Sequence, residues 1–253
     1  MTPLKLELLG MELWRIDRHQ LLHHLFAELD AGRGGWIITA NLDFMRRFDR
    51  HPEMRDLYRS ADIRVADGMP LVWASHLKGE PVPERVPGSG LLSLLAERAG
   101  ERGRSLYLLG GAEGAAAAAA EKLRHQHPGL KITGWSSPWV SSPPKPEELE
   151  GTLAALRAAP ADIILVGLGS PKQEQLISAL RPHFPGAWMM GVGISFSFIA
   201  GTIKRAPPIL QKTGLEWVHR LAQEPRRLSR RYLIEDLPFS FELFLRSYLE
   251  RRR

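Results

Sequence analysis

The sequence predicts an α/β protein, because short runs rich in aliphatic and β-branched residues alternate with longer segments whose apolar residues recur at helical spacing. Runs such as Ile163–Val166 are apolar without interruption, which is typical of parallel strands buried on both faces. Strand signals stop after Gly201. We therefore expect a Rossmann-like, largely parallel sheet with flanking helices in residues 1–200 and a C-terminal helical appendage in residues 201–253.

Strands are expected where a short apolar run is bounded by glycine, proline or polar residues. Seven runs meet this description: Leu6–Leu9, Trp36–Ala40, Ile63–Ala66, Leu106–Leu109, Lys131–Trp135, Ile163–Gly167 and Trp188–Val192. Apolar residues at helical spacing occur in Leu21–Leu29, Leu91–Leu95 and Ala115–Leu123, so helices should connect the strands. The proline-rich stretch from Ser136 to Pro146 predicts a loop.

The appendage carries the whole basic excess of the chain. The formal net charge is +6, and basic and acidic residues balance over residues 1–200, whereas basic residues outnumber acidic ones two to one in residues 201–253. Pro207-Pro208, Pro225 and Pro238 are each expected to open a helix there. Such a segment suits an anionic partner, namely phosphates, nucleic acid or an anionic membrane surface, and the alternative is a solvated helical tail.

Several function classes lack the residues that they need. The chain has no cysteine, which excludes disulfides, thiolate zinc sites and cysteine nucleophiles. It contains no G-x-G-x-x-G, P-loop or G-x-S-x-G motif, and no Asp-x-Asp pair for a metal on a diphosphate. Met1–Gly10 lacks the apolar core of a signal peptide, and the uncharged stretch Ala187–Ile203 is glycine-containing and short for a membrane span. We therefore expect a cytoplasmic protein without a bound metal.

Small and polar residues follow the predicted strands at four points: Thr39-Ala40-Asn41, Ala66-Asp67-Gly68, Gly110-Gly111 and Gly167–Glu174. In parallel sheets ligands bind at the carboxyl ends of the strands, so we expect these residues at one site. Glycine turns before helices suit a diphosphate, because bare N–H groups and the helix dipole face the anion. Taken singly, each glycine run is equally consistent with a tight strand-to-helix turn.

Asp67 is the candidate general base. It directly follows a buried strand, where desolvation can raise the pKa of a carboxyl toward that of a usable base. The alternative is that Asp67 caps the helix starting near Pro70. Thr39 and Asn41 are likewise open between capping the next helix and binding a substrate.

Eight motifs occur in order along nearly the whole chain: Thr39-Ala40-Asn41, Ala66-Asp67-Gly68-Met69-Pro70, Arg85-Val86-Pro87-Gly88, Leu109-Gly110-Gly111, Gly167-Leu168-Gly169-Ser170-Pro171-Lys172-Gln173-Glu174, Gly191-Val192-Gly193 through Phe196 to Gly201, Arg205-Ala206-Pro207, and Gly214-Leu215-Glu216-Trp217 to Arg231-Tyr232. In this order they resemble the WecG/TagA/CpsF family of glycosyltransferases. No single motif is decisive, but eight in sequence leave little room for coincidence.

The resemblance implies an inverting, metal-independent glycosyltransferase that needs no cofactor. Such an enzyme moves a sugar, typically of the N-acetylmannosamine type, from a UDP donor to a polyprenyl-diphosphate-linked acceptor sugar, and builds teichoic-acid linkage units, enterobacterial common antigen, or capsular or exopolysaccharides. The alternatives are a glucosyl or glucuronosyl transferase of exopolysaccharide assembly and a non-catalytic sugar-nucleotide-binding module. Nucleic acid is not an expected partner, because the aromatic residues of the tail fall on an apolar helical face.

The resemblance also implies roles for individual residues. Asp67 is the implied base, and the other catalytic candidates are Thr39, Asn41, Arg85 and Gln173. The residues expected to contact the donor are Gly110, Gly111, Trp135, Gly167, Gly169, Lys172, Glu174, Gly193 and Arg205, with Trp139 as the alternative to Trp135 near the uracil.

The appendage is implied to close over the active site as a lid and to associate with the cytoplasmic face of the membrane. Its arginines are expected to meet the diphosphate, and the candidates are Arg220, Arg226, Arg227, Arg230 and Arg231. The charge distribution agrees with this role. The donor sugar, the acceptor, and the choice between a monomer and a homo-oligomer stay open.

Overall fold

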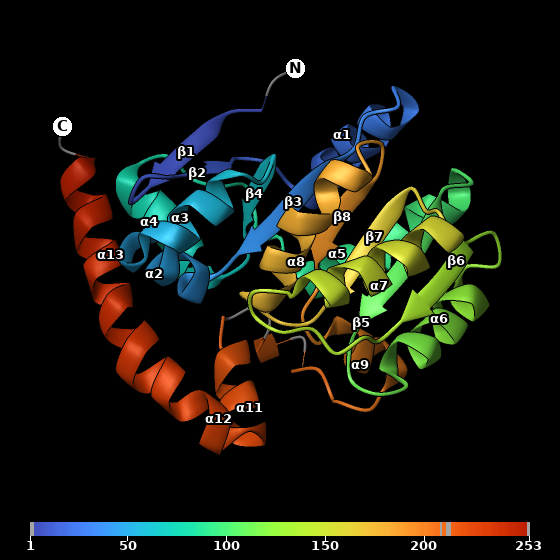
Figure 1. The fold of residues 1–253 in the computed structure, drawn as a ribbon. Helices are drawn as coiled ribbons and strands as arrows, with labels where there is room; N and C mark the ends of the chain where they lie inside the picture. Colours follow the sequence, from blue (N-terminus) through green and yellow to red (C-terminus); the bar gives the residue numbers. More distant parts are fainter. Residues whose placement is uncertain (1–2, 208, 211–213, 252–253) are drawn as a thin grey trace.

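The computed structural model describes residues 3–207, 209–210 and 214–251, and it has an α/β architecture (Figure 1). A six-stranded parallel sheet runs through it in the order β4-β3-β8-β7-β5-β6. Its strands are β3 (Gly35–Ala40), β4 (Ile63–Ala66), β5 (Ser105–Gly110), β6 (Lys131–Ser136), β7 (Ile163–Gly167) and β8 (Trp188–Gly191). The predicted Rossmann-like sheet is therefore confirmed, and all the expected strands but the first lie in it.

The first expected strand belongs to a separate hairpin. β1 (Lys5–Leu8) pairs in antiparallel register with β2 (Met11–Trp14), a strand that the sequence prediction missed. A two-residue turn joins them, in which Leu9 and Gly10 have positive φ angles of 49° and 82°. Alternate residues of both strands are buried, so the hairpin covers the core instead of extending the main sheet.

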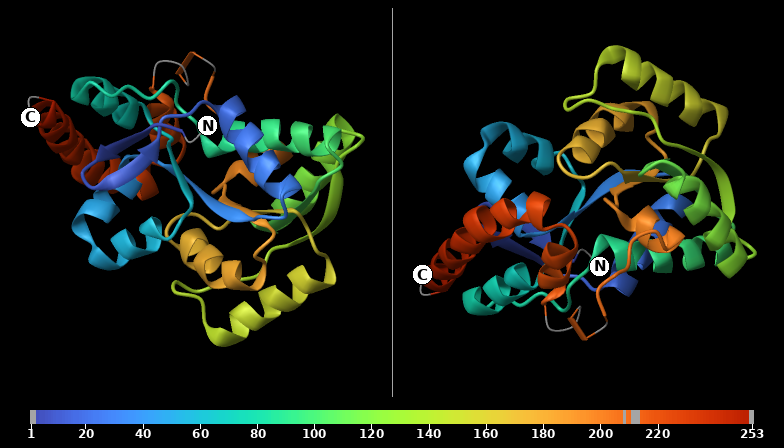
Figure 2. Two further views of the ribbon diagram at one scale, coloured as in Figure 1. Left: turned by 90° about the horizontal axis from the view of Figure 1, so that it is seen from above. Right: turned by 90° about the horizontal axis from the view of Figure 1, so that it is seen from below.

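Helices connect the strands and cover both faces of the sheet (Figure 2). One face packs against α2 (Leu42–Arg50), α3 (Pro52–Arg59), α4 (Met69–Lys78), α7 (Pro146–Ala158) and α8 (Lys172–Leu180), which ends in the 3-10 turn η1 (Arg181–His183). The other face packs against α1 (Arg18–Asp30), α5 (Gly88–Glu101), α6 (Ala115–Gln126) and α9 (Ser195–Ala200). Successive strand residues such as Ile163 and Ile164 lie in opposite layers, which explains the uninterrupted apolar runs.

The described part of the appendage consists chiefly of α11 (Glu216–Gln223), α12 (Pro225–Ser229), the π-helical segment η2 (Arg230–Asp236) and α13 (Leu237–Glu250). α12, η2 and α13 follow one another without a break, and α13 packs along α4. Phe239 and Leu243 of α13 join the same core as the hairpin. The helix expected to open at Pro207-Pro208 falls partly on residues outside the described ones, and α11 begins only at Glu216.

The carboxyl ends of the parallel strands meet at one edge of the sheet. The arrowheads of β3 and β5 point toward the part of the molecule where α11 and α12 lie (Figure 1). Because ligands of open parallel sheets bind at this edge, the fold brings the appendage to the place where a site is expected.

Candidate active site

Three chain segments converge at the carboxyl ends of β3 and β4. The backbone N–H of Asp67 donates to the carbonyl of Ala40 at 2.7 Å, and the N–H of Val86 donates to the carbonyl of Ala66 at 2.8 Å. Gly68 lies against Asn41, since a Cβ at Gly68 would be 3.8 Å from the Cα of Asn41. The structure therefore brings together the first three motifs.

The carboxyl of Asp67 faces the start of α5. Its Oδ2 accepts a long hydrogen bond, of 3.4 Å, from the N–H of Gly88. The N-cap of α4 is Gly68, without a side-chain hydrogen bond, so Asp67 does not cap that helix. Among the described residues, no cation lies within ion-pair distance of Asp67. The carboxyl is thus held close to charged groups without being committed to any of them.

The surroundings of Asp67 raise its pKa to about 7. Burial of the carboxyl is the main cause, although the residue keeps some solvent exposure, and the negative charge of Glu216 adds to it. The positive charges of Arg85 and Arg220 and the Gly88 N–H act in the opposite direction. A carboxyl with a pKa near neutrality can take up and release a proton under physiological conditions, as a general base must.

Thr39 and Asn41 have different surroundings. The Oδ1 of Asn41 accepts the N–H groups of Asp43 and Phe44 at 3.1 and 3.3 Å, so Asn41 caps α2. Thr39 is buried and takes no part in the cap, and a Cβ at Gly88 would come within 3.0 Å of its Oγ1. Thr39 therefore packs next to the residue that hydrogen-bonds Asp67.

Helix α11 of the appendage lies against this group. The Nη1 of Arg85 donates to the Oε2 of Glu216 at 3.1 Å, and the two side chains are only 16% and 17% exposed. Arg220 follows one helical turn later, on the same side of α11, and its charge acts on Asp67. Gly214, with a φ angle of 77°, packs against Met69 just before the helix. Residues far apart in the sequence thus form one site.

Two of the predicted arginines have buried donors without a partner. The Nε of Arg205 and the Nε of Arg220 are buried and make no hydrogen bond to the described part of the chain, and the same holds for the Nδ1 of His219. Arg205 lies beside the first turn of α5, where its Nη2 is 3.9 Å from the position of a Cβ on Gly90. An unpaired buried donor costs about 1–3 kcal/mol, so such groups call for an acceptor. Guanidinium groups in this state suit an anionic ligand.

The glycine turns are built as expected, but several of their N–H groups are already used. Gly110, Gly111, Gly169 and Gly193 have positive φ angles, between 55° and 92°. The N–H of Gly111 donates to the carbonyl of Gly167 at 2.7 Å. The N–H groups of Gly169 and Gly193 both donate to the Oε1 of Gln173, at 3.2 and 3.0 Å. In this conformation these three amides do not offer a free donor to a phosphate.

Gln173 and Glu174 form a buried pair behind the turns. The Nε2 of Gln173 donates to the Oε1 of Glu174 at 2.7 Å, and burial raises the pKa of Glu174 to about 7. Gln173 therefore links the loops that follow β7 and β8, and both its amide atoms are engaged inside the protein. A role in holding the loops fits its contacts, whereas a direct contact with the acceptor would require these bonds to change.

The two tryptophan candidates for the uracil occupy different places. Trp135 lies on β6 with the guanidinium of Arg124 5.3 Å from its ring centre. Trp139 is largely exposed in the following loop, with the ammonium of Lys172 5.3 Å from its ring centre. Because Lys172 opens α8 directly after the Gly169 turn, Trp139 is the tryptophan that neighbours another predicted donor residue.

Three other candidate arginines of the appendage have described side chains that lie away from Asp67. Arg231 pairs with Asp43 and Asp236, at 3.3 and 3.4 Å. Arg230 is 82% exposed and pairs with Glu235, and Arg226 is exposed. The side chain of Arg227 lies outside what the structure describes. Of the candidates with described side chains, the structure brings Arg220 to Asp67.

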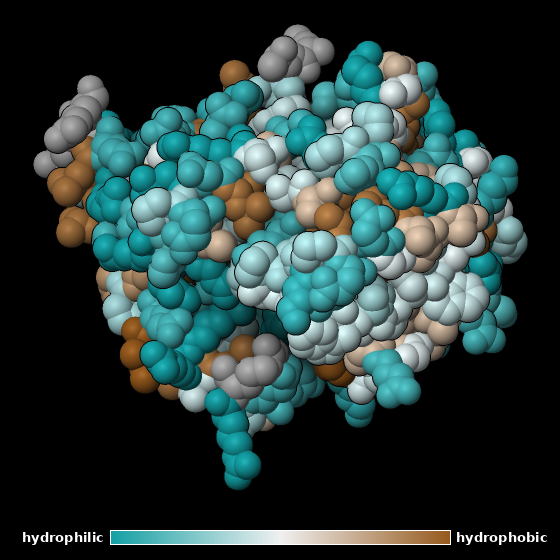
Figure 3. All heavy atoms as spheres, viewed as in Figure 1, coloured by the Kyte–Doolittle hydropathy of each residue, from teal (hydrophilic) through white to brown (hydrophobic). Residues whose placement is uncertain are grey.

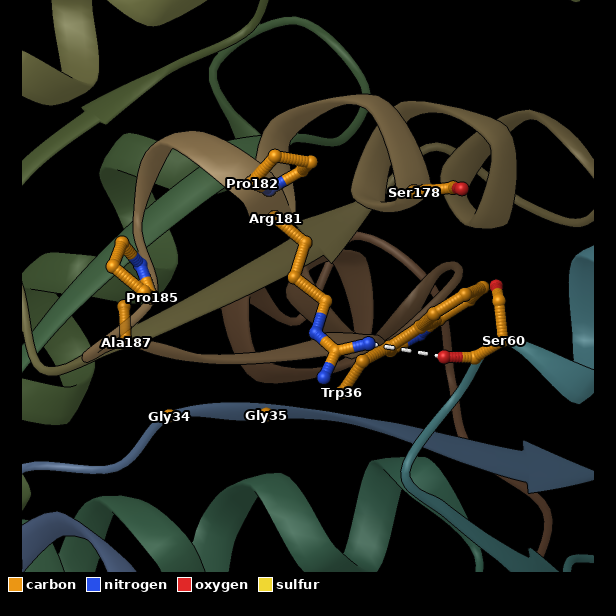
Figure 4. Close-up of a pocket in the computed structure, with 9 residues that line it drawn as sticks. All are labelled: Gly34, Gly35, Trp36, Ser60, Ser178, Arg181, Pro182, Pro185 and Ala187. Carbon is orange, nitrogen blue, oxygen red and sulfur yellow. Dashed lines mark hydrogen bonds between the residues drawn. The ribbon is translucent and has the colours of Figure 1, made fainter.

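A pocket at the opposite edge of the sheet offers no comparable chemistry (Figure 4). It lies near the amino ends of β3 and β8, and its guanidinium, from Arg181, donates to the Ser60 carbonyl at 3.0 Å and to Asp62 at 2.6 Å. This cation is therefore already neutralised, and the strand ends that carry ligand sites in such sheets lie on the other side.

A parallel α/β sheet with an uncommitted carboxyl and partly unpaired guanidinium groups at its strand ends is typical of enzymes that act on anionic ligands. The comparison with protein families defines the class more closely. A sequence model described as the glycosyl transferase WecG/TagA/CpsF family matches residues 6–253, and the chain belongs to this family. It is accordingly a glycosyltransferase of cell-surface polysaccharide synthesis, a class that in general uses a sugar-nucleotide donor and a lipid-linked acceptor.

The structure also adds site residues that the sequence prediction missed. Glu216 and His219 both lie on α11, next to residues that had been singled out. The Gly214-Leu215-Glu216-Trp217 motif contained Glu216 but gave no sign of its partner, because Arg85 is 131 residues away.

Proposed function

We propose that this chain is an inverting glycosyltransferase that moves a sugar of the N-acetylmannosamine type from a UDP donor to a polyprenyl-diphosphate-linked acceptor sugar without a metal ion. The observation that carries the proposal is the Asp67 carboxyl, whose pKa is about 7, placed beside arginines with unpaired donors. The sugar type rests on the family resemblance, which extends over residues 6–253.

The proposed reaction is a single displacement. Asp67 accepts the proton of the acceptor hydroxyl, and the hydroxyl oxygen forms a bond to the anomeric carbon of the donor sugar. The bond between that carbon and the diphosphate oxygen breaks on the opposite side, so the configuration inverts and UDP leaves with the electron pair. One base is enough for this step.

Arginine side chains are proposed to meet the charge that grows on the departing diphosphate. Arg220 and Arg205 contribute buried donors that have no partner within the described chain, and Arg85 lies beside the carboxyl. Such preorganised cations stabilise a developing anion most strongly where water is excluded. The described residues contain no cluster of three or more His, Asp or Glu side chains suited to a metal ion.

The decisive experiment is a donor screen. UDP-N-acetylmannosamine, UDP-N-acetylglucosamine, UDP-glucose and UDP-glucuronate are each incubated with a soluble polyprenyl-diphosphate-N-acetylglucosamine analogue, and UDP release is measured. We expect release with the mannosamine donor and a product of inverted anomeric configuration by NMR. Turnover of only the glucose or glucuronate donor would support an exopolysaccharide transferase, and binding of UDP without turnover of any donor would support a non-catalytic module.

Removal of divalent metals is a second test. We expect EDTA to leave the rate of UDP release essentially unchanged, because arginines are proposed to neutralise the diphosphate. The rate is compared before chelation, after chelation and after addition of Mn²⁺. A rate that falls with EDTA and returns with Mn²⁺ would show that the enzyme uses a metal.

The appendage is further proposed to bind an anionic membrane surface, where a lipid-linked acceptor would be found. Phe241, Leu245 and Leu249 form an exposed apolar stripe along α13, opposite the buried Phe239 and Leu243. In Figure 3 apolar side chains gather along the left margin of the molecule, where Figure 1 shows α13. No helix within the described residues is long and apolar enough to cross a membrane. Association with a membrane surface therefore fits the apolar stripe of α13 and the basic charge of the appendage.

A further inference from the structure

The charges around Asp67 are paired in an unexpected way. Two arginines, Arg85 and Arg220, lie near enough to influence the carboxyl, yet the described structure contains no salt bridge between Asp67 and either of them. Arg85 instead donates to Glu216 at 3.1 Å, across the boundary between the α/β sheet and the appendage. The cation that is best placed to neutralise Asp67 is thus held by a different carboxylate.

This diversion matters because both partners are largely buried. The side chains of Arg85 and Glu216 are only 16% and 17% exposed. If the pair were broken, water could therefore solvate the two charges only in part. A partly buried guanidinium that loses its carboxylate is left with an uncompensated charge and favours pairing with another anion. Asp67 is a nearby anion, since the charge of Arg85 is the largest influence that lowers its pKa.

We propose that Glu216 is a positioning residue: by holding the guanidinium of Arg85 it keeps this cation from pairing with Asp67, and so leaves the Asp67 carboxylate free to accept a proton. That this proton comes from the acceptor hydroxyl rests on the proposed function, whereas the arrangement of the charges does not depend on it. Because Glu216 is supplied by α11, the carboxylate is free only while the appendage is docked on the sheet.

The charged groups that act on Asp67 come from two parts of the described chain. Arg85 precedes α5, and Glu216 and Arg220 lie on α11. The Gly88 N–H at the start of α5 is the uncharged donor. Of these groups Glu216 alone is an anion, so its removal leaves Asp67 among cations. The pKa of Asp67 should then fall, because a cation within a few ångströms favours the charged carboxylate.

The experiment compares the full-length protein with Glu216→Gln, which removes the charge, and Glu216→Asp, which keeps it. The pH dependence of kcat/KM on a soluble acceptor reports the free enzyme. Activity of the wild type should fall as the pH drops through about 7, where Asp67 becomes protonated. In Glu216→Gln this limb should move to lower pH by about one unit or more, the usual effect of a newly paired cation. At pH values above the limb kcat/KM should also fall, because Asp67 is then a weaker base and is paired with Arg85.

Glu216→Asp and a second variant, Glu242→Gln, serve as controls. Glu216→Asp should restore the limb toward the wild-type position. Glu242→Gln removes an appendage carboxylate that pairs with Arg246 on α13, and it should leave the limb unchanged. Glu216→Gln could instead lose activity to the same extent at every pH, with its acidic limb at the wild-type position. In that case Glu216 merely fastens α11 to the sheet and the proposal is wrong.

A direct titration keeps this test separate from the test of the reaction. The carboxyl of Asp67 is followed by ¹³C NMR in protein labelled at aspartate, and its signal is identified by its absence in Asp67→Asn. If no donor is turned over, the proposed function fails, but a lower pKa of Asp67 in Glu216→Gln than in the wild type still supports the positioning role. An equal or higher pKa in Glu216→Gln overturns it.

Discussion

Different interactions hold the α/β sheet region and the appendage in place, and the candidate active site lies between the two regions. In the sheet region, strand residues such as Leu165 and Val166 are fully buried in opposite layers, so apolar packing determines where Asp67 lies. In α11 no residue is buried, and its contact with the site is the Glu216–Arg85 ion pair. The proposed base is therefore positioned by packing, whereas the arginine of α11 that is proposed to assist it is placed largely by charge.

The appendage itself divides into two parts. Helix α13 buries Phe239 and Leu243 in the core and cannot leave without exposing them. The preceding η2 is tied to α2 by ion pairs, among them Arg46 with Glu235 at 2.8 Å and Arg231 with Asp43 at 3.3 Å. Asp43 and Asp236 are almost fully buried in the pairs that hold η2, and Leu228 of α12 is buried too, so α12 and η2 are fixed together with α13. Helix α11 has no buried residue and is therefore the part of the described appendage that packing holds least. The lid that the family resemblance implies would therefore be α11, with α13 holding the appendage in place.

The largest effect should come from the base in the sheet region. Asp67→Asn should lower the turnover of UDP-sugar by roughly two to four orders of magnitude, the usual contribution of a positioned base. UDP binding, measured by calorimetry, should persist because the arginines remain. Asp56→Asn, on the exposed surface of α3, is the matched control and should retain the wild-type rate. An Asp67→Asn protein with near-wild-type turnover would remove this carboxyl from the mechanism.

The next effect should come from α11. Arg220→Ala should lower kcat by about 100- to 1000-fold, as expected when one donor to a developing anion is lost. Because the charge of Arg220 lowers the pKa of Asp67, the acidic limb of the pH profile should move to higher pH, opposite to the shift expected for Glu216→Gln. Guanidinium ion in solution should restore part of the rate. Arg226→Ala, whose side chain is exposed, should keep the wild-type rate on a soluble acceptor.

Loss of activity in Arg226→Ala together with an active Arg220→Ala protein would reverse the comparison. It would mean that the appendage docks in another register when substrate is bound, with a different arginine turned toward the diphosphate.

The contrast between the two regions also explains what the sequence could predict. The sheet strands were found to within a residue or two, because continuous burial leaves an unbroken apolar signal in runs such as Ile163–Gly167. Asp67 was singled out because a carboxyl directly after such a strand should lie at the ligand-binding edge, and the structure places it there, while its role as the base stays a prediction. The hairpin strand Met11–Trp14 is only four residues long and was missed, because the alternate burial of its residues and the positive φ angles of the Leu9-Gly10 turn are seen only in the structure.

The appendage could be predicted only in outline. Its basic charge is a property of composition, but which arginine turns inward depends on where each helix meets the sheet. Arg231 was expected at the diphosphate, and in the structure it pairs with Asp43, a residue of α2 that no local pattern connects with it. The Glu216–Arg85 pair is equally invisible in the sequence, because single ion pairs between distant segments leave no periodic signal.

The anchor should affect stability and not chemistry. Leu243→Ala in α13 removes a side chain that is 0% exposed, and it should lower the free energy of unfolding by about 2–5 kcal/mol. Urea denaturation followed by circular dichroism measures this change. If α13 and the sheet share one core, the transition should remain single and move to lower urea. A separate early transition with an unchanged main one would show that α13 folds independently of the sheet region.

The smallest effect should appear on the outer face of the same helix. Leu245 is 60% exposed, two residues from Leu243, so Leu245→Ala should change the free energy of unfolding by no more than about 0.5 kcal/mol. Its binding to vesicles containing an anionic phospholipid should nevertheless weaken severalfold, because an apolar side chain that enters the interface contributes about 1–3 kcal/mol. Binding of both proteins should fall as salt rises, since the basic residues of the appendage contribute through charge that salt screens. Cosedimentation at two salt concentrations measures both dependences. Equal vesicle binding by Leu245→Ala and the wild type would show that the stripe does not face the membrane, and binding that ignores salt would show that the basic residues do not.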